Sequence, residues 1–306
     1  MQNIKYFSYI ISAFLLISCG EDFFDSVTEI EIPEHEPQLV LRAKFDATYL
    51  EFSNLVELRH TLGILDSTEF EEINDAEIEL YEDGLLKSTF EHLSESWYQG
   101  EIDNLEAGKI YTLKANSPTF GSVEASQKTP NKVQITGVTF EADGAVDRYG
   151  DRGDEVTIQF QDPAGETNYY LVNVSATYRF ESPDTNFIID NYGLYSSPVD
   201  PLLEDLNQLY LTDISFDGEM YTTRIRVNLP QAGTMNIEGA RNLAAEKITA
   251  HLTSVSRDKY LFEKTFYAHR ENDGNPFAEP VVIHENIEDG SGIFTLSVTD
   301  EFSVEL

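Results

Sequence analysis

The chain has 306 residues, of which 55 are acidic and 20 are basic, so its formal net charge at pH 7 is −35. This charge excludes nucleic acid as a partner and opposes close contact with anionic lipid head groups. The single cysteine rules out an internal disulfide bond, so hydrophobic packing has to stabilise the fold.

Residues 1–18 predict a bacterial lipoprotein signal peptide. One positive charge precedes an apolar run that is too short to span a bilayer. The run ends in three residues suited to signal-peptidase recognition, followed by the only cysteine: Leu16, Ile17, Ser18 and Cys19. We expect cleavage before this cysteine and its acylation, for example with palmitate, which gives lasting attachment to membrane lipid. The alternative is an ordinary signal peptide with an incidental cysteine.

Residues 19–37 then predict a lipidated tether. Glu21 and Asp22 stand almost directly behind the cysteine. This placement resembles the acidic export signal of surface lipoproteins in Gram-negative bacteria that have SusC/SusD-type uptake systems. The resemblance implies an outer-membrane protein that is exposed on the cell surface.

Residues 38–130 show the alternation of apolar and polar residues that is typical of half-buried strands. Such strands are expected near 39–45, 76–81, 110–115 and 123–129, and Asp83-Gly84 predicts a hairpin turn. The order of strands and turns resembles transthyretin-like modules. We therefore expect a small N-terminal β-sandwich.

Residues 131–306 predict a second β-rich domain. Strand patterns recur near 133–141, 155–161, 169–180, 221–229 and 247–255, and a last strand or hairpin is expected over 293–306. Ser256 can cap a helix that continues to about Arg270. Residues 181–219 lose the strand period, and leucines within 201–210 favour a short helix there. The fold class expected is thus mainly β, with two β-sandwich-like domains of the immunoglobulin or transthyretin kind, the second carrying a helical insertion and one packed helix.

Several motifs in the second half resemble those of domain-of-unknown-function family 4249. The closing motifs are Gly-Asn-Pro-Phe-Ala-Glu-Pro at 274–280, Asn-Ile at 286–287 and Gly-Ser-Gly-Ile-Phe at 290–294. Earlier ones are Asp-Pro-x-Gly at 162–165 with Asn-Tyr-Tyr at 168–170, Asp213 before Phe-Asp-Gly at 216–218, and Ser-x-Ser-x-x-x-Tyr at 254–260. The resemblance covers nearly the whole mature chain. It implies an outer-membrane lipoprotein, often encoded beside a TonB-dependent receptor, with no established activity.

No catalytic motif stands out, so we do not expect an enzyme. The sequence has no Gly-x-Ser-x-Gly, no His-Glu-x-x-His and no phosphate-binding glycine loop. Four aspartates in a glycine-bearing segment suggest either a Ca²⁺ site or an ordinary solvated turn: Asp143, Asp147, Asp151 and Asp154. No other cofactor is indicated.

The irregular segment 181–219 is rich in tyrosine, which suits recognition because it gives large contact area at little entropic cost. We expect Tyr192, Tyr195 and Tyr210 to face a partner, or alternatively to cap an open end of the sandwich. The function expected is a non-catalytic accessory of a TonB-dependent uptake system. The alternatives are a structural or adhesive envelope lipoprotein and a surface glycan hydrolase.

Overall fold

The computed structural model describes residues 35–66, 71–181, 186–229 and 242–306. It divides into residues 1–36 and one compact unit, Pro37–Leu306, to which everything below refers. The predicted signal peptide, Cys19 and nearly all of the tether lie outside the described residues. The unit is mainly β, with large sheets and one long helix among its described residues, which confirms the expected β-sandwich-like class.

Two sheets make up the unit. The larger one has its strands in the order β13 (Glu204–Asp205), β14 (Leu209–Thr212), β10 (Tyr169–Glu181), β16 (Asn242–Val255), β17 (Ser291–Glu305), β1 (Leu39–Asp46), β2 (Leu55–His60), β5 (Trp97–Gly100), β4 (Leu85–Ser94), β3 (Glu77–Glu82), β6 (Ile110–Ser117) and β7 (Gly121–Lys128), with β11 (Asn186–Gly193) beside β10. The smaller one runs β12 (Ser196–Pro198), β15 (Met220–Val227), β9 (Arg152–Gln161) and β8 (Ile135–Val146).

Two hydrophobic cores follow from these sheets. In the first, alternate residues of β1 to β7 point inward, such as Leu41, Leu80 and Leu113, as the period of the sequence predicts. The predicted turn at Asp83-Gly84 joins β3 to β4 with positive φ at both residues. The second core lies between the smaller sheet and the face of the larger one formed by β10, β14 and β16.

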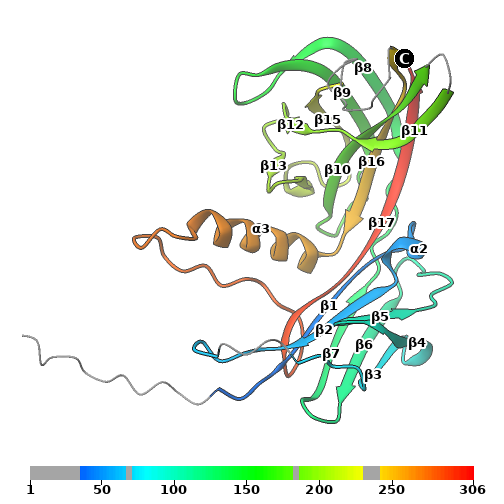
Figure 1. Ribbon diagram of the computed structural model, residues 1–306. Coiled ribbons are helices and arrows are strands. Elements are labelled where there is room, and N and C mark those ends of the chain that lie inside the picture. Colours follow the sequence, from blue (N-terminus) through cyan, green and yellow to red (C-terminus); the bar gives the residue numbers. More distant parts are fainter. Residues whose placement is uncertain (1–34, 67–70, 182–185, 230–241) are drawn as a thin grey trace, which may run out of the picture. The chain divides into compact units, whose positions relative to one another are not determined.

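Strand β17 serves both cores (Figure 1). Its first part pairs with β1 in parallel, and Phe294 and Leu296 are buried in the first core. From Ser297 onward it pairs with β16, where Val304 packs against the second core. The expected boundary near Pro130 falls between β7 and β8, yet the last strand belongs to both sides. Independent folding of 38–130 and 131–306 therefore stays a prediction.

The predicted helix is α3 (Arg257–Asn272), which follows β16 directly and stands out from the sheet (Figure 1). Ser256 caps it as expected, since its hydroxyl accepts a hydrogen bond from the backbone N–H of Lys259. Tyr260 is the buried residue of the helix and packs near Tyr169 and Tyr210 of the sheet. The helix is thus fixed by its first turns.

The expected helical insertion is wrong for the described part of 181–219. That part forms β11 to β14, apart from a single 3₁₀ turn, η2 (Asp213–Ser215). The leucines do not share one face, because Leu203 and Leu209 are buried in the second core whereas Leu202 is 39% exposed. A side-chain turn at Asp200 and a positive φ at Asn207 reverse the chain instead.

Candidate functional site

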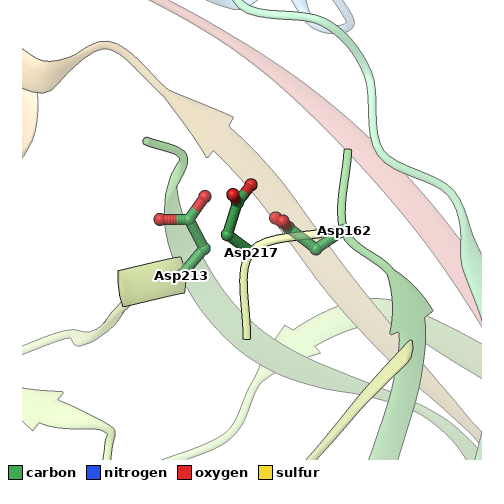
Figure 2. Close-up of side chains that lie close together, drawn as sticks. All are labelled: Asp162, Asp213 and Asp217. Carbon is green, nitrogen blue, oxygen red and sulfur yellow. The ribbon is translucent and has the colours of Figure 1, made fainter. Parts of the chain in front are cut away.

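Three carboxylates converge at one end of the second core: Asp162, Asp213 and Asp217 (Figure 2). Asp162 follows β9, Asp213 opens η2 and Asp217 lies in the turn before β15. One oxygen from each lies within 4.8 Å of one from each of the others. Asp162 and Asp213 are each only 1% exposed, whereas Asp217 is exposed. This is the closest grouping of possible metal ligands among the described residues.

Hydrogen bonds hold each carboxylate and join two loops, residues 162–168 and 213–219. Asp213 Oδ2 accepts from the backbone N–H of Asn168 at 2.7 Å and from its Nδ2 at 3.1 Å. Asp217 Oδ1 accepts from Gly165 N–H at 2.8 Å. Asp162 accepts from the Tyr170 hydroxyl and, at 2.9 Å, from a backbone N–H of the other loop. The cluster therefore acts as a clasp between the loops.

Gly218, whose backbone N–H donates to Asp162, is the residue that the geometry of this loop requires. Its φ is +74°, and a Cβ placed on it would lie 2.6 Å from the Cβ of Ala164 in the opposite loop. An L side chain would be strained there and would also push the loops apart. The Phe-Asp-Gly motif thus supplies one carboxylate and the close approach beside it.

The three charges repel one another, and the hydrogen-bond donors named above offset this repulsion. Burial raises the pKa of Asp162 above its ordinary value, the Tyr170 and Gly218 bonds oppose this rise, and the charges of Asp213 and Asp217 add to it. Three carboxylates are part of the six to eight oxygens that Ca²⁺ takes. The arrangement can therefore store a proton or contribute ligands to a cation.

Sequence reasoning missed this cluster as a site, although its motifs were visible. Both Asp-Pro-x-Gly and Phe-Asp-Gly are turn sequences, and nothing in their spacing indicates that two turns about fifty residues apart will meet. The pairing of β9 with β15 and that of β10 with β14 bring them together.

The four aspartates predicted from sequence as a cation site do not converge. They lie on the β8–β9 hairpin, where Asp143 N–H donates to Asp154 Oδ1 at 3.0 Å and the side chain of Asp151 is 74% exposed. Asp147 is buried and turned toward a different partner. The hairpin therefore has one buried carboxylate and no close group of the four, and the Ca²⁺ site stays a prediction.

The partner of the buried Asp147 is Arg226 on β15. Its Nε lies 2.8 Å from Asp147 Oδ2, and the Ser197 hydroxyl donates to the same oxygen at 2.7 Å. Burial alone would raise the pKa of Asp147, but the bonds from Ser197, from the backbone N–H groups of Asp151 and Tyr149 and from Arg226 hold it well below its usual range. Asp147 therefore stays ionised and ties the hairpin to β12 and β15.

The three predicted partner-facing tyrosines separate into two groups. Tyr210 is fully buried beside Tyr260, so its prediction as a surface residue is wrong: β14 turns it into the small core beneath α3. Tyr192 and Tyr195 are 40% and 70% exposed. Tyr149, which the sequence did not single out, is 64% exposed on the hairpin, and its hydroxyl lies 3.3 Å from Asp205 Oδ2.

Another cluster has the order of a serine-hydrolase relay. Ser175 Oγ lies 2.8 Å from His251 Nε2, and His251 Nδ1 lies 2.9 Å from Glu301 Oε1. Burial lowers the pKa of His251 despite the opposing charge of Glu301, so the ring is mainly neutral at pH 7. Ser175, however, sits inside β10 between Gly193 of β11 and Thr249 of β16. The ladders take up the backbone N–H groups that an oxyanion would need, so the cluster is a polar contact across the sheet.

Comparison with protein families gives one result. The model for a domain of unknown function, DUF4249, matches residues 26–303. The chain belongs to the DUF4249 family. No curated protein and no solved structure matches this DUF4249 chain. Among its described residues, no helix has the length and apolar character needed to cross a membrane.

Several of the motifs that carried the resemblance fall at two structural points of the DUF4249 chain. The first is the carboxylate clasp. The second is the seam between β1 and β17, where Gly292 has φ +116° and a Cβ on it would lie 2.0 Å from Leu41 O. Asn286 supports that seam, because its side chain exchanges hydrogen bonds of 2.9 and 2.8 Å with the backbone of Phe294. Both points hold strands together.

Proposed function

We propose that this DUF4249 protein is an outer-membrane lipoprotein on the cell surface, and that it serves as a non-catalytic binding component of a TonB-dependent uptake system. The observation that carries the proposal is the order of its parts. Leu16, Ile17 and Ser18 precede Cys19, an acidic tether follows, and the folded unit begins at Pro37, where the predicted tether ends. An anchor, a spacer and a β-rich unit suit a protein that presents a binding surface away from the membrane.

The surface that best supports binding is formed by Tyr149, Tyr192 and Tyr195, hereafter the tyrosine surface. Tyr192 lies near the end of β11 and Tyr195 in the short connection from β11 to β12, and Tyr149 lies on the hairpin that packs beside β12. Exposed tyrosines offer apolar area and a polar tip without much rotamer entropy. On a chain of formal net charge −35, these three exposed rings offer apolar contact area to a partner.

The base of the tyrosine surface is rigid. Arg148 donates to the Asp200 and Leu203 carbonyl oxygens, and its backbone N–H donates to Pro198 O at 3.3 Å. Beneath it, Asp147 links Ser197 and Arg226. Residues held by their supports lose less entropy on binding, which favours affinity. The β8–β9 hairpin, which the sequence predicts as a cation site, and the segment 186–205 thus support the tyrosine surface together.

Fractionation of Cys19→Ala tests the anchor on which this function depends. We expect the variant to stay uncleaved or to become soluble in the periplasm, whereas Ser12→Ala, a small change in the same apolar run, should be processed normally. Protease treatment of intact cells should degrade the wild type if it is on the surface. A Cys19→Ala protein that is cleaved and remains in the outer membrane would contradict the proposal.

A further inference from the structure

A cleft of about 770 Å³ opens along β4 and β5 in the sheet of the first core. Parts of these two strands line it, together with Asn54 and Glu101. A second cavity of about 480 Å³ shares Asn54 and Glu101 with the cleft, so the two form one groove. Clefts of this size hold small ligands. The groove belongs to the first core, whereas the tyrosine surface and the carboxylate clasp belong to the second.

The lining of the cleft is polar, and most of its polar groups are neutral. Amides or hydroxyls come from Asn54, Ser88, Thr89 and Gln99. Glu91 and Glu101 add carboxylates, and no lysine or arginine is found among the described residues that line the cleft. Amides both donate and accept hydrogen bonds, and carboxylates accept them from hydroxyl groups. A ligand with many hydroxyl groups therefore finds partners along the cleft, whereas the carboxylates repel an anionic one.

Internal hydrogen bonds fix part of the lining and leave another part to a ligand. Asn54 Nδ2 donates to Gly100 O at 2.9 Å, which ties the start of β2 to the end of β5. The side chains of Glu91 and Gln99, both exposed, form no hydrogen bond or ion pair within the part of the chain that the structure describes. These two residues are partners across β4 and β5. A carboxylate and an amide side by side can thus bond to neighbouring hydroxyl groups of one ligand.

Trp97, the only tryptophan of the chain, flanks the cleft. It lies two residues before Gln99 on β5, and the alternation of a strand places both side chains on the same face. Its partner on β4 is Ser94, which follows Leu93 of the lining. Trp97 is half-buried and packs into none of the hydrophobic cores of the described residues, whereas Tyr98 is 1% exposed. The indole therefore presents apolar surface beside the amide and the carboxylate.

We propose that this groove binds a neutral oligosaccharide, with a sugar ring against Trp97 and its hydroxyl groups bonded to Glu91 and Gln99. A sugar ring has C–H groups on its faces and hydroxyl groups around its rim, which match an aromatic face beside polar side chains. The groove continues into the second cavity, which suits a chain of several sugar units. This site is separate from the tyrosine surface, so sugar binding does not depend on the proposed receptor contact.

The fluorescence of Trp97 tests the proposal, since no other tryptophan contributes to it. The purified protein is titrated with short neutral oligosaccharides of glucose, mannose, galactose and xylose, and with a short oligolysine peptide as the cationic alternative. We expect a saturable change in emission with at least one of the oligosaccharides and none with oligolysine. No saturable response to any of the oligosaccharides, in emission or by calorimetry, would overturn the proposal. A response to oligolysine alone would overturn it in favour of a cationic ligand.

Gln99→Ala should weaken binding about tenfold, as expected for the loss of the hydrogen bonds of its amide. The control Gln159→Ala removes an exposed glutamine from β9 of the smaller sheet and should leave affinity unchanged. Glu91→Gln removes the charge but keeps a hydrogen-bonding group, so affinity for a neutral sugar should stay within about threefold. Equal affinities for Gln99→Ala and Gln159→Ala would overturn the proposal, because the sugar would then lie elsewhere.

Discussion

Asp147 and Asp162 are both buried aspartates that tie loops to the second core, but the protein neutralises them in different ways. Asp147 meets the guanidinium of Arg226 and a serine hydroxyl, with the side chains of the ion pair 0% and 5% exposed. Asp162 meets a tyrosine hydroxyl and a backbone N–H, with two further carboxylates beside it. One site is a paired charge and the other is a concentration of like charge.

The two environments shift the pKa values in opposite directions. That of Asp147 is lowered and that of Asp162 is raised. A buried ion pair is costly to break, because removing one partner leaves the other charge without compensation. A carboxylate that lies beside other carboxylates is stabilised when it takes up a proton, because the repulsion among the charges falls. The same residue type therefore serves as a fixed anchor in the hairpin and as a titratable clasp between the loops.

Arg226→Leu should have the largest effect, since it leaves Asp147 buried and ionised. We expect a loss of about 3–5 kcal/mol in the free energy of unfolding, measured by urea denaturation. Arg224→Leu, two residues away on the same strand, removes a 3.7 Å ion pair whose arginine side chain is 52% exposed, and should cost less than about 1 kcal/mol. Similar losses for the two variants would mean that the buried pair contributes no more than a surface one.

Gly218→Ala should open the clasp. The positive φ and the contact with Ala164 predict a loss of about 2 kcal/mol in unfolding free energy, seen as a lower urea midpoint. The control is Gly193→Ala, because nothing lies within 4 Å of a Cβ placed there. We expect it to change stability by about 0.5 kcal/mol or less. An unchanged midpoint for Gly218→Ala would show that the two loops do not depend on their close approach.

The sequence predicts the first core well because its strands alternate strictly, as in β1 and β6, and because Asp83-Gly84 marks its turn. It fails in 181–219, where β12, β13 and β14 have only three, two and four residues and so show no period, and where the leucines turn to different neighbours. The sequence also does not predict the pairing of β1 with β17. Val40 and Ser291 are partners across some 250 residues, and no local pattern encodes such a contact.

The candidate sites also differ in how far the sequence predicts them. The anchor at Cys19 can be predicted because its signal is contiguous in the sequence. Tyr195 and Tyr210 look alike in sequence, whereas the structure exposes one and buries the other. The carboxylate clasp joins turns that only the fold brings together.

The opposite pKa shifts predict opposite pH slopes. The native state binds fewer protons at Asp147 than the unfolded state, so its contribution to stability is present above the ordinary pKa of 3.8 and is lost as the pH falls below it. At Asp162 the native state binds more protons, so its contribution is present below 3.8 and is lost as the pH rises through the raised pKa. Each slope is at most about 1.4 kcal/mol per pH unit.

Unfolding free energies of Asp147→Asn and Asp162→Asn, measured from about pH 3 to about pH 7, separate the two contributions. The difference between wild type and Asp147→Asn should shrink toward low pH. Relative to wild type, Asp162→Asn should instead gain stability toward neutral pH. Parallel curves for both variants would show that neither carboxylate changes its proton affinity on folding.

Co-purification from detergent-solubilised outer membranes, read by mass spectrometry, tests the proposed binding function most directly. The wild type should retain a TonB-dependent receptor. The triple variant Tyr149→Ala, Tyr192→Ala, Tyr195→Ala should lose it at an unchanged melting temperature. Phe277→Ala, at an aromatic residue that is 95% exposed on a different loop, should retain the receptor and serves as the matched control. Undiminished recovery of the receptor with the triple variant, or no receptor with the wild type, would contradict the account.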